Sequence, residues 1–341
     1  MRCNRILHSC RRKQNCLILY TGPIRKQGVI INTGGRTDTV NYYSDWLLRR
    51  FREGYVLVRN PYYPRTVLRY ELDPAVVDCV VFCSKNYAPI LPRLHEITDR
   101  FNTYFHYTIT AYGKDIEPAV PSIEESMGTL KELSSMVGKG RVAWRYDPVL
   151  LTPKYTTEVH LETFERMAGE LSPYVDRCIF SFVEMYRKLE VNMPTLRAVA
   201  PEQMDILAEG MGRIARNCGL AIQTCGHKED FSRFGIHRSG CMTPDILGDA
   251  NGCLFRKISG KGVGGATRQG CGCMPTRDIG AYNSCPNGCR YCYANRNPEL
   301  ARRNLALHDP ASPMLLGHLE EGDTVRPAVQ ESFLSCEMRL F

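Results

Sequence analysis

The sequence lacks long apolar runs and a recognisable secretory signal. Its longest apolar stretches, such as residues 76–83, fall far short of the roughly 20 apolar residues that a membrane-spanning helix needs. The apolar piece CLILY near the N-terminus is too short for the core of a signal peptide. We therefore expect a cytoplasmic protein without a membrane partner.

Acidic residues are missing from the first 26 positions, which hold seven Lys and Arg side chains. This arm accounts for much of the net charge of +8 that the 341 residues carry. We expect residues 1–28 to form a basic N-terminal extension, and a solvated arm explains it more simply than nucleic-acid binding does. A nucleic-acid substrate stays open on charge alone but is not favoured.

Cysteine is abundant, and its distribution is uneven. Of 16 cysteines, six fall in the first 200 residues, whereas nine lie between Cys218 and Cys292. A long chain without a secretory signal is expected to keep its thiols reduced. The local concentration of thiols therefore indicates a metal or cluster site more than a set of disulfides.

Short apolar stretches alternate with amphipathic ones along the first two thirds of the chain. The apolar stretches predict strands over residues 29–33, 76–85, 104–113, 141–151, 177–186 and 220–225, and a hairpin over 55–72. The amphipathic stretches predict helices over residues 42–53, 88–101, 123–138, 157–171 and 201–219. Repeated strand–helix units build a parallel sheet, so the predicted fold class is α/β, with a (β/α) barrel or partial barrel over residues 29–225.

This alternation stops after Cys225. Residues 226–275 are rich in Gly and Cys, and the stretch GKGVGGATRQGCGC within them has no helical or strand period, as in a long loop that is functional or disordered. Residues 276–308 resume with a strand over 278–283 (DIGAYN), a cysteine motif and a helix over 298–308. The tail over residues 309–341 is interrupted by Pro and is ambiguous.

The cysteine motif reads Cys285-Pro-Asn-Gly-Cys289-Arg-Tyr-Cys292, a C-x3-C-x2-C spacing. Such a loop can curl three thiolates around one [4Fe–4S] cluster, each binding a different iron, and Gly288 permits the tight turn. The fourth iron is then free to chelate the amino and carboxylate groups of S-adenosylmethionine (SAM). The alternatives are a zinc knuckle, which would need a fourth ligand, or an inert set of thiols.

The C-x3-C-x2-C spacing with an aromatic residue before the last cysteine resembles the signature of the radical SAM superfamily. The resemblance implies a reduced cluster that cleaves SAM to methionine and a 5′-deoxyadenosyl radical, which abstracts hydrogen from a substrate. It also implies a reducing partner such as flavodoxin or ferredoxin, and a position near the adenine for Tyr291. The cofactor carries such chemistry and the protein orients it.

Several segments resemble a bacterial and archaeal family known as DUF1848, whose members carry a radical-SAM-like cysteine cluster at the C-terminal end. The segments are RTDTVNYYSDW, EGYVLVRNPY, RYDPVLL and DIGAYNSCPNGCRYCYAN, and the resemblance covers roughly residues 29–320. It implies a circularly permuted barrel in which residues 278–283 form a strand beside residues 29–33. The sequence has GGRTD where that family has SxRRTD, so no role is assigned to Gly34 or Gly35.

Four further cysteines flank the irregular segment and match positions expected in the same family. They could close around a second [4Fe–4S] cluster or a tetrahedral zinc ion, or remain free thiols. Cys253 lies in the same segment and could substitute for one of them. Cys79, Cys83 and Cys178 lie in apolar strands and are interpreted as small buried hydrophobic residues. The four candidate ligands are Cys225, Cys241, Cys271 and Cys273.

Polar residues follow the predicted strands, at the edge where barrel enzymes place their working groups. Lys85, Arg145, Asp147 and Glu184 are the candidate catalytic residues. Arg36 and Asp38 follow the first strand and are candidates for binding SAM. An internal ion-pair network that fixes loops is an equal alternative for each of these residues. His106 lies within a predicted strand and is interpreted as a core histidine.

Together the patterns predict a radical SAM enzyme of unknown substrate. Two alternatives remain open at this level. One is a non-catalytic iron–sulfur protein in electron transfer or regulation, whose clusters are fully ligated by protein. The other is a zinc-stapled nucleic-acid-binding protein, although the basic residues concentrate in the N-terminal arm and not beside the cysteines.

Overall fold

The computed structural model describes residues 28–256 and 271–335. The predicted N-terminal extension, apart from Gly28, lies outside the described residues, as do residues 257–270 of the Gly-rich segment and the last six of the tail. Among the described residues, no helix combines the length and the apolar character needed to cross a bilayer.

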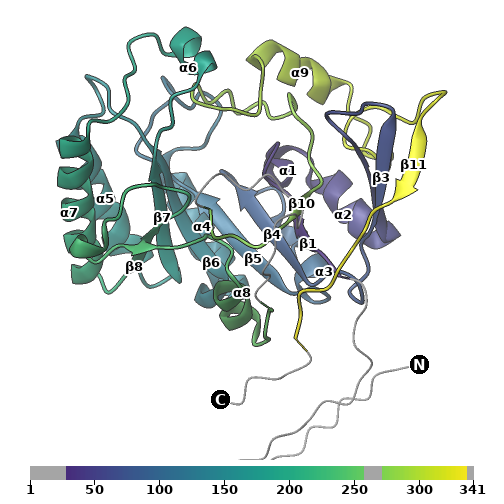
Figure 1. Cartoon of the computed structure of the whole chain (residues 1–341), viewed down its shortest axis with the longest axis horizontal. Coiled ribbons are helices and arrows are strands. Elements are labelled where there is room, and N and C mark those ends of the chain that lie inside the picture. The colour runs from purple at the N-terminus through teal and green to yellow at the C-terminus, as the bar shows by residue number, and fades with distance from the viewer. Residues whose placement is uncertain (1–27, 257–270, 336–341) are drawn as a thin grey trace, which may run out of the picture.

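An eight-stranded sheet forms the centre of the fold, and all of its neighbouring strands pair in parallel (Figure 1). The order of the strands is β10-β1-β4-β5-β6-β7-β8-β9. The predicted α/β class with a parallel sheet is therefore confirmed. The strands are β1 (Ile30–Asn32), β4 (Cys79–Ser84), β5 (Thr103–Thr108), β6 (Val142–Val149), β7 (Arg177–Phe182), β8 (Ala221–Thr224), β9 (His237–Arg238) and β10 (Arg277–Asp278).

Helices follow most of the strands and cover the outer face of the sheet (Figure 1). The predicted helices over 123–138, 157–171 and 201–219 are present almost as expected, and the one over 42–53 is present from residue 44 onward, whereas the one over 88–101 is much shorter. Pro92 lies in a 3-10 turn that shortens the helix expected over 88–101, and the extended φ of Tyr43, −133°, separates α1 from α2. The helices are α1 (Thr39–Tyr42), α2 (Ser44–Glu53), α3 (His95–Thr98), α4 (Ile123–Val137), α5 (Thr157–Leu171), α6 (Arg187–Asn192), α7 (Pro201–Asn217), α8 (Pro244–Asn251) and α9 (Pro298–Ala306).

The strands alternate their side chains between two apolar cores, as the period of two requires. Val80, Phe82 and Trp144 point outward into the core beneath the helices. Val81 and Tyr104 point inward, where they meet α8 and the C-terminal segment. The inner core fills the space between the strands near α8, away from the carboxyl ends where the cavity lies.

The predicted position of the late strand is confirmed. β10 pairs in parallel with β1, with Ile31 opposite Arg277 and Asn32 opposite Asp278. β10 begins one residue earlier than the predicted strand over 278–283 and is much shorter. It ends at Asp278 because the Asp278 carboxylate accepts a 2.9 Å hydrogen bond from the Gly280 N–H, which turns the chain away from the sheet. The last strand of the eight-stranded sheet along the chain, β10, thus lies beside the first, β1, as a permuted barrel requires.

The barrel is partial. β9 and β10 are the two edges of the sheet, and no strand pairing joins them among the described residues. β6, predicted over residues 141–151, runs through Pro148 to Val149, with a shift of register after Tyr146. That irregularity bends the strand where the polar side chains of the site begin.

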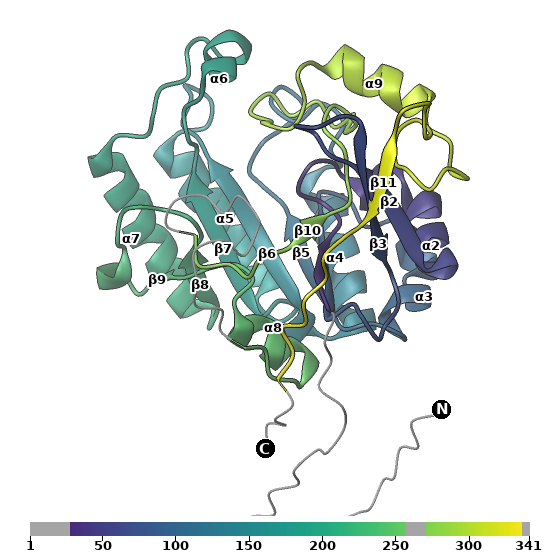
Figure 2. The same ribbon diagram turned by 45° about the vertical axis from the view of Figure 1, so that its right-hand side comes forward.

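A second, three-stranded sheet flanks the barrel. The predicted hairpin is present as β2 (Tyr55–Arg59) and β3 (Thr66–Glu71), paired antiparallel. The tail contributes β11 (Thr324–Pro327), which pairs in parallel with β3 and then leads across the molecule toward α8 (Figure 2). The tail is therefore part of the fold up to at least residue 335.

The Gly- and Cys-rich segment over 226–275 contains regular structure that its composition conceals. α8 begins at Thr243, whose hydroxyl accepts from the Ile246 N–H at 3.2 Å, and ends at Gly252 with a φ of +65°. Thr-Pro at the start and Gly at the end are ordinary helix-boundary signals. The expectation that this whole segment is irregular is therefore wrong for α8 and for β9.

Candidate functional site

One cavity of about 870 Å³ opens at the carboxyl ends of the parallel strands. Its size lies within the range of small-molecule sites. Every residue that the sequence singled out for a site lines it, so residues up to 256 positions apart come together here. They are Arg36, Asp38, Lys85, Arg145, Asp147, Glu184, Cys225, Cys241, Cys271, Cys273, Cys285, Cys289, Tyr291 and Cys292.

Three of the cysteines, here called the loop cysteines, are Cys285, Cys289 and Cys292, on the loop that follows β10. Gly288 has a φ of +71°, which favours glycine and gives the loop its turn. The loop is fixed by backbone hydrogen bonds to the segment after β5: the Ala119 N–H donates to the Asn287 carbonyl at 3.1 Å and the Arg290 N–H to the Ile116 carbonyl at 3.0 Å. Burial raises the pKa of the Cys285 and Cys289 thiols.

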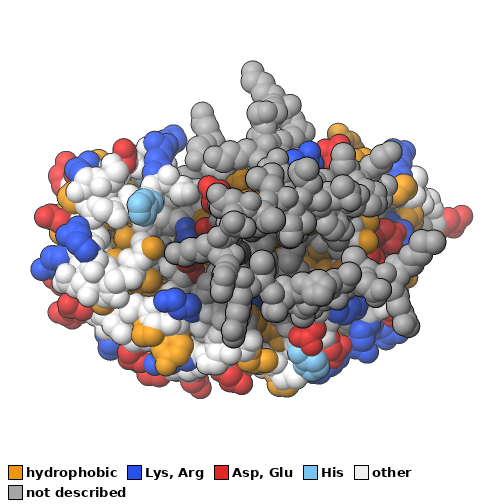
Figure 3. Space-filling view, turned by 90° about the horizontal axis from the view of Figure 1, so that it is seen from below, with side chains coloured by type: hydrophobic (Ala, Val, Ile, Leu, Met, Phe, Trp, Pro, Cys, Tyr) orange, Lys and Arg blue, Asp and Glu red, His pale blue; other side chains and the backbone are white. Residues whose placement is uncertain are grey.

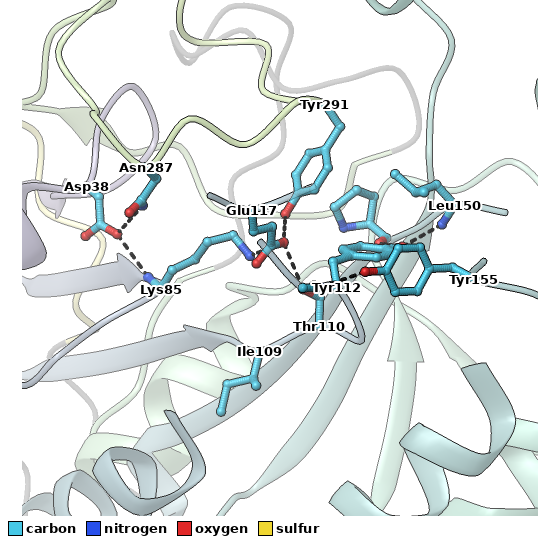
Figure 4. A network of polar contacts seen from close by, with 12 residues as sticks. Asp38, Lys85, Ile109, Thr110, Tyr112, Glu117, Leu150, Tyr155, Asn287 and Tyr291 are labelled. Carbon is cyan, nitrogen blue, oxygen red and sulfur yellow. Dashed lines mark hydrogen bonds and ion pairs between the residues drawn. The ribbon is translucent and has the colours of Figure 1, made fainter. Parts of the chain in front are cut away.

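Asp38 fixes the middle of this loop (Figure 4). Its buried carboxylate accepts hydrogen bonds from the Asn287 amide at 3.1 Å and from the Lys85 N–H at 3.1 Å. It also accepts from the Ser84 hydroxyl at 2.6 Å and from the Asn41 N–H at 3.1 Å. Burial raises the pKa of Asp38, and these four donors oppose the rise. The four bonds occupy the carboxylate, so Asp38 positions the loop rather than offering a free oxygen to a ligand.

Lys85 and Tyr291 meet at a carboxylate that the sequence did not single out (Figure 4). Glu117, 3% exposed, accepts hydrogen bonds from Lys85 Nζ at 2.9 Å, from Thr110 Oγ1 at 2.8 Å and from the Tyr291 hydroxyl. Burial lowers the pKa of Lys85, but Glu117 and the nearby Cys289 thiol more than offset this, so the pKa is raised. Lys85 is therefore a buried cation beside the loop cysteines.

The far side of the loop is held by α6, a helix that the sequence did not reveal. Lys188 Nζ donates to the Cys292 carbonyl at 2.8 Å. Asn192 Nδ2 donates to the Arg290 carbonyl at 3.1 Å, and the Arg290 guanidinium donates back to the Asn192 carbonyl at 2.7 Å. The Tyr186 hydroxyl donates to the Tyr291 carbonyl. Three segments, after β1, after β5 and after β7, thus enclose the loop.

Arg36 links the loops after β1 and β10. Its Nε donates to Asp278 Oδ1 at 2.9 Å, and its guanidinium lies 5.8 Å from the ring centroid of Tyr282. A glycine at position 34 lets the backbone pass close to Cys83, since a Cβ there would lie 2.0 Å from the Cys83 carbonyl oxygen. Arg36 still lines the cavity, but its main partner is Asp278, a residue that the sequence did not single out.

The four other candidate ligands, here called the edge cysteines, are Cys225, Cys241, Cys271 and Cys273. The Cys241 and Cys273 sulfurs are 3.4 Å apart, and those of Cys225 and Cys273 are 3.7 Å apart. The sulfurs of these three all lie within 4.8 Å of one another, so they could hold a metal ion. Cys271 interacts with the thiols of Cys225 and Cys273.

Three candidates at the ends of strands remain. Arg145 and Asp147 lie beside the edge cysteines, and Glu184 faces the open cavity. Arg145 Nη1 donates to the Cys241 sulfur at 3.6 Å, and its other terminal nitrogen pairs with Asp147. The Ser181 hydroxyl also donates to Asp147. Glu184 is exposed at the rim of the cavity. Arg145 and Asp147 therefore form an ion pair of the kind expected as the alternative to direct ligand binding.

His106 is a core histidine, as predicted. It is fully buried, with Nδ1 3.3 Å from the Cys83 sulfur and Nε2 3.1 Å from the Cys241 carbonyl oxygen. Burial, aided by Arg145, lowers the pKa of His106 to about 3, and burial raises the pKa of Cys83 to about 12. Both side chains are therefore neutral near pH 7.

The interpretation of the strand cysteines as small buried hydrophobic residues is confirmed for two of them and wrong for Cys83, which is half-buried and lines the cavity. Cys79 and Cys178 are fully buried among apolar side chains. Cys253 packs near Cys79 in the inner core and is not among the residues that line the cavity. It does not substitute for an edge cysteine in this arrangement.

Two solved structures show a distant likeness to this chain. An HpcH/HpaI aldolase from Desulfitobacterium hafniense DCB-2 matches at 10% identity and a TM-score of 0.23, over 62% of this chain and 82% of the other. The carboxyl transferase domain of Rhizobium etli pyruvate carboxylase, determined with pyruvate, matches at 12% identity and a TM-score of 0.25, over 60% of this chain and 36% of the other. Likeness at this level carries no information on function.

No protein with a curated description matches the chain. A family model does. It covers residues 30–294, which include the parallel sheet, the edge cysteines and the loop cysteines. The chain belongs to the family described as a domain of unknown function, DUF1848.

Proposed function

We propose that this chain is a radical SAM enzyme whose [4Fe–4S] cluster is held by the three loop cysteines. The observation that carries the proposal is the position of the loop. It follows the strand that lies beside β1, it is enclosed by three other segments, and its thiols face the same cavity as the polar ends of the strands. A cluster bound there would meet a small molecule in that cavity.

The donor set fits such a cluster better than it fits a single ion. In a [4Fe–4S] cluster each cysteine binds a different iron, so the ligating sulfurs do not touch. Among the described residues, no thiol–thiol hydrogen bond joins the loop cysteines, in contrast to the edge cysteines. The edge cysteines themselves form the group that could share one ion. The separated sulfurs of the loop cysteines therefore suit a cluster, and the touching sulfurs of the edge cysteines suit a single ion.

The surrounding residues supply order and charge. When bound, the cluster and SAM would supply a 5′-deoxyadenosyl radical, which abstracts a hydrogen atom from the substrate. Asp38 and Lys188 hold the backbone of the loop in place. Lys85 places a buried positive charge beside Cys289, which favours an anionic cluster there. The Tyr291 ring is fixed through Glu117 and Tyr186 at the wall of the cavity.

An external reductant such as flavodoxin or ferredoxin completes the proposal, because reductive cleavage consumes an electron. Nucleic acid is not favoured as the substrate. On the face seen in Figure 3, basic and acidic side chains of the described residues are interspersed, not segregated into a basic stripe. The chemical class of the substrate stays open within the cavity.

The test is anaerobic reconstitution with iron and sulfide, reduction in the presence of SAM, and chromatography for 5′-deoxyadenosine and methionine. We expect both products from the unaltered chain and neither from Cys292→Ala. Cys218→Ala is the matched control, since Cys218 caps α7 away from the cavity, and it should retain product formation. A reduced cluster whose EPR spectrum is unchanged by SAM, with no 5′-deoxyadenosine, would favour a non-catalytic iron–sulfur protein.

A further inference from the structure

We propose that the edge cysteines bind one tetrahedral zinc ion, and that this ion joins the two open edges of the partial barrel. The proposal does not depend on the cluster at the loop cysteines. It decides between the second cluster, the zinc ion and the free thiols that the sequence left open.

The spacing of the sulfurs favours one shared ion. Four thiolates at about 2.3 Å from a tetrahedral zinc ion lie about 3.8 Å from one another. The distances of 3.7 Å between Cys225 and Cys273 and 3.4 Å between Cys241 and Cys273 are close to this value. A [4Fe–4S] cluster would hold the sulfurs farther apart, because each would bind a different iron. Three sulfurs that lie within 4.8 Å of one another, with the Cys271 thiol in contact with two of them, suit zinc, which is the common ion of tetrahedral sulfur sites.

The polar contacts around the sulfurs suit an anionic site. The Cys241 N–H donates to the Cys273 sulfur at 3.1 Å. The Arg145 guanidinium lies 3.6 Å from the Cys241 sulfur and is paired on its other side with Asp147. Zinc with four thiolates carries two negative charges, which a guanidinium and an N–H donor partly offset. Arg145 is thereby a positioning residue for this site.

The position of the site shows what the ion would do. Cys225 follows β8, Cys241 follows β9, and Cys273 precedes β10 by four positions. The chain segments after β9 and before β10 touch directly, since the Met274 N–H donates to the Met242 carbonyl at 2.8 Å. A Cβ on Gly240 would lie 2.5 Å from the backbone of Gly272. The ion would thus connect the two edges that no strand pairing joins among the described residues.

The experiment is metal analysis of the full chain and of three variants. The first variant replaces all three loop cysteines by Ala. The second is Cys273→Ser, and the third, a matched control outside the site, is Cys253→Ser. We expect about one zinc ion per chain in the unaltered protein, the loop variant and the control, and loss of that zinc in Cys273→Ser. Zinc X-ray absorption on the unaltered chain should show four sulfur neighbours at about 2.3 Å and needs no variant to fold.

The opposite results are equally specific. Iron with acid-labile sulfide retained in the loop variant would establish a second cluster and overturn the zinc site. A single iron without sulfide, or no metal at all in the unaltered chain, would overturn it as well. None of these measurements involves SAM. The zinc site can therefore be disproved while the proposed enzyme activity is confirmed, and the activity can be disproved while the zinc site is confirmed.

Discussion

Asp38 and Asn287 lie 249 positions apart in the chain, and the Asn287 amide donates a 3.1 Å hydrogen bond to the Asp38 carboxylate. Asp38 stands at the start of α1, and Asn287 lies in the middle of the loop that carries Cys285, Cys289 and Cys292. The same carboxylate accepts the Lys85 N–H from the end of β4. One buried side chain thus connects the loop that carries Cys285, Cys289 and Cys292 to two neighbouring strands of the barrel.

Replacing Asp38 by Asn should destabilise the fold by about 1–3 kcal/mol. The amide group would turn an acceptor into a donor facing other donors, so buried N–H groups would lose their partner. Urea unfolding measures the change. Asp45→Asn is the control: Asp45 is a 78% exposed side chain in a surface pair with Arg93, and its replacement should cost less than about 1 kcal/mol. Equal midpoints for the two variants would show that Asp38 does not hold the loop.

Replacement by Ala should lower the stability of the fold at Gly34 and raise it at Gly128. A Cβ at Gly34 would lie 2.0 Å from the Cys83 carbonyl oxygen, so the segment after β1 would have to move away from strand β4, and we expect a cost of at least about 1–3 kcal/mol. Gly128 lies exposed in α4 with nothing within 4 Å of the added Cβ, so Ala should stabilise the chain by about 0.5–1 kcal/mol. Thermal unfolding of both variants checks the pair. A neutral Gly34→Ala would contradict the close approach of these loops.

Much of the barrel could be predicted because its signals are local. The apolar runs of β4, β5 and β7 and the capped helices α4 and α5 are continuous in sequence, and polar residues follow the strands directly. Parallel strands bring those residues to one edge, so the strand pattern placed Arg36, Asp38, Lys85, Arg145, Asp147 and Glu184 at the cavity. The C-x3-C-x2-C spacing is equally local.

The supporting contacts could not be predicted because they join distant segments. Glu117 lies in a polar loop without a motif, and its role arises from contact with Tyr291, 174 positions away. α6 is six residues long and carries no capping side chain, so its sequence gave little sign of a helix. α8 differs: its Thr-Pro start and Gly end were readable, and the composition of the segment hid them.

Replacing Glu117 by Gln should leave Lys85 as a buried charge without its counter-ion. The two side chains are 3% and 12% exposed, and breaking a buried pair from one side costs about 3–5 kcal/mol. The double variant Lys85→Met/Glu117→Gln should recover part of this loss, because it removes the unpaired charge. Chemical unfolding of the single and the double variant measures the energetic coupling between Lys85 and Glu117. Glu124→Gln, in an exposed pair with Arg166, is the control and should change stability by less than about 1 kcal/mol.

Two results would contradict this account of Glu117. A single variant as stable as the control would show that the buried pair contributes nothing to the fold. A double variant less stable than the single one would show that Lys85 has another partner that compensates its charge.

Lys188 should control how long a reconstituted cluster survives rather than how stable the fold is. Its ammonium donates to the Cys292 carbonyl at 2.8 Å from α6, which lies at the rim of the cavity. Loss of this charged hydrogen bond, worth about 1.5 kcal/mol, should let the loop open about tenfold more often. We expect Lys188→Ala to lose its iron–sulfur absorbance about tenfold faster in air, while its free energy of unfolding falls by no more than the same roughly 1.5 kcal/mol. Lys131→Ala, which removes a surface pair with Glu170, is the matched control and should bleach at the unaltered rate. Equal bleaching of Lys188→Ala and Lys131→Ala would mean that α6 does not restrain the loop, and faster bleaching with a large fall in stability would assign Lys188 to the fold as a whole.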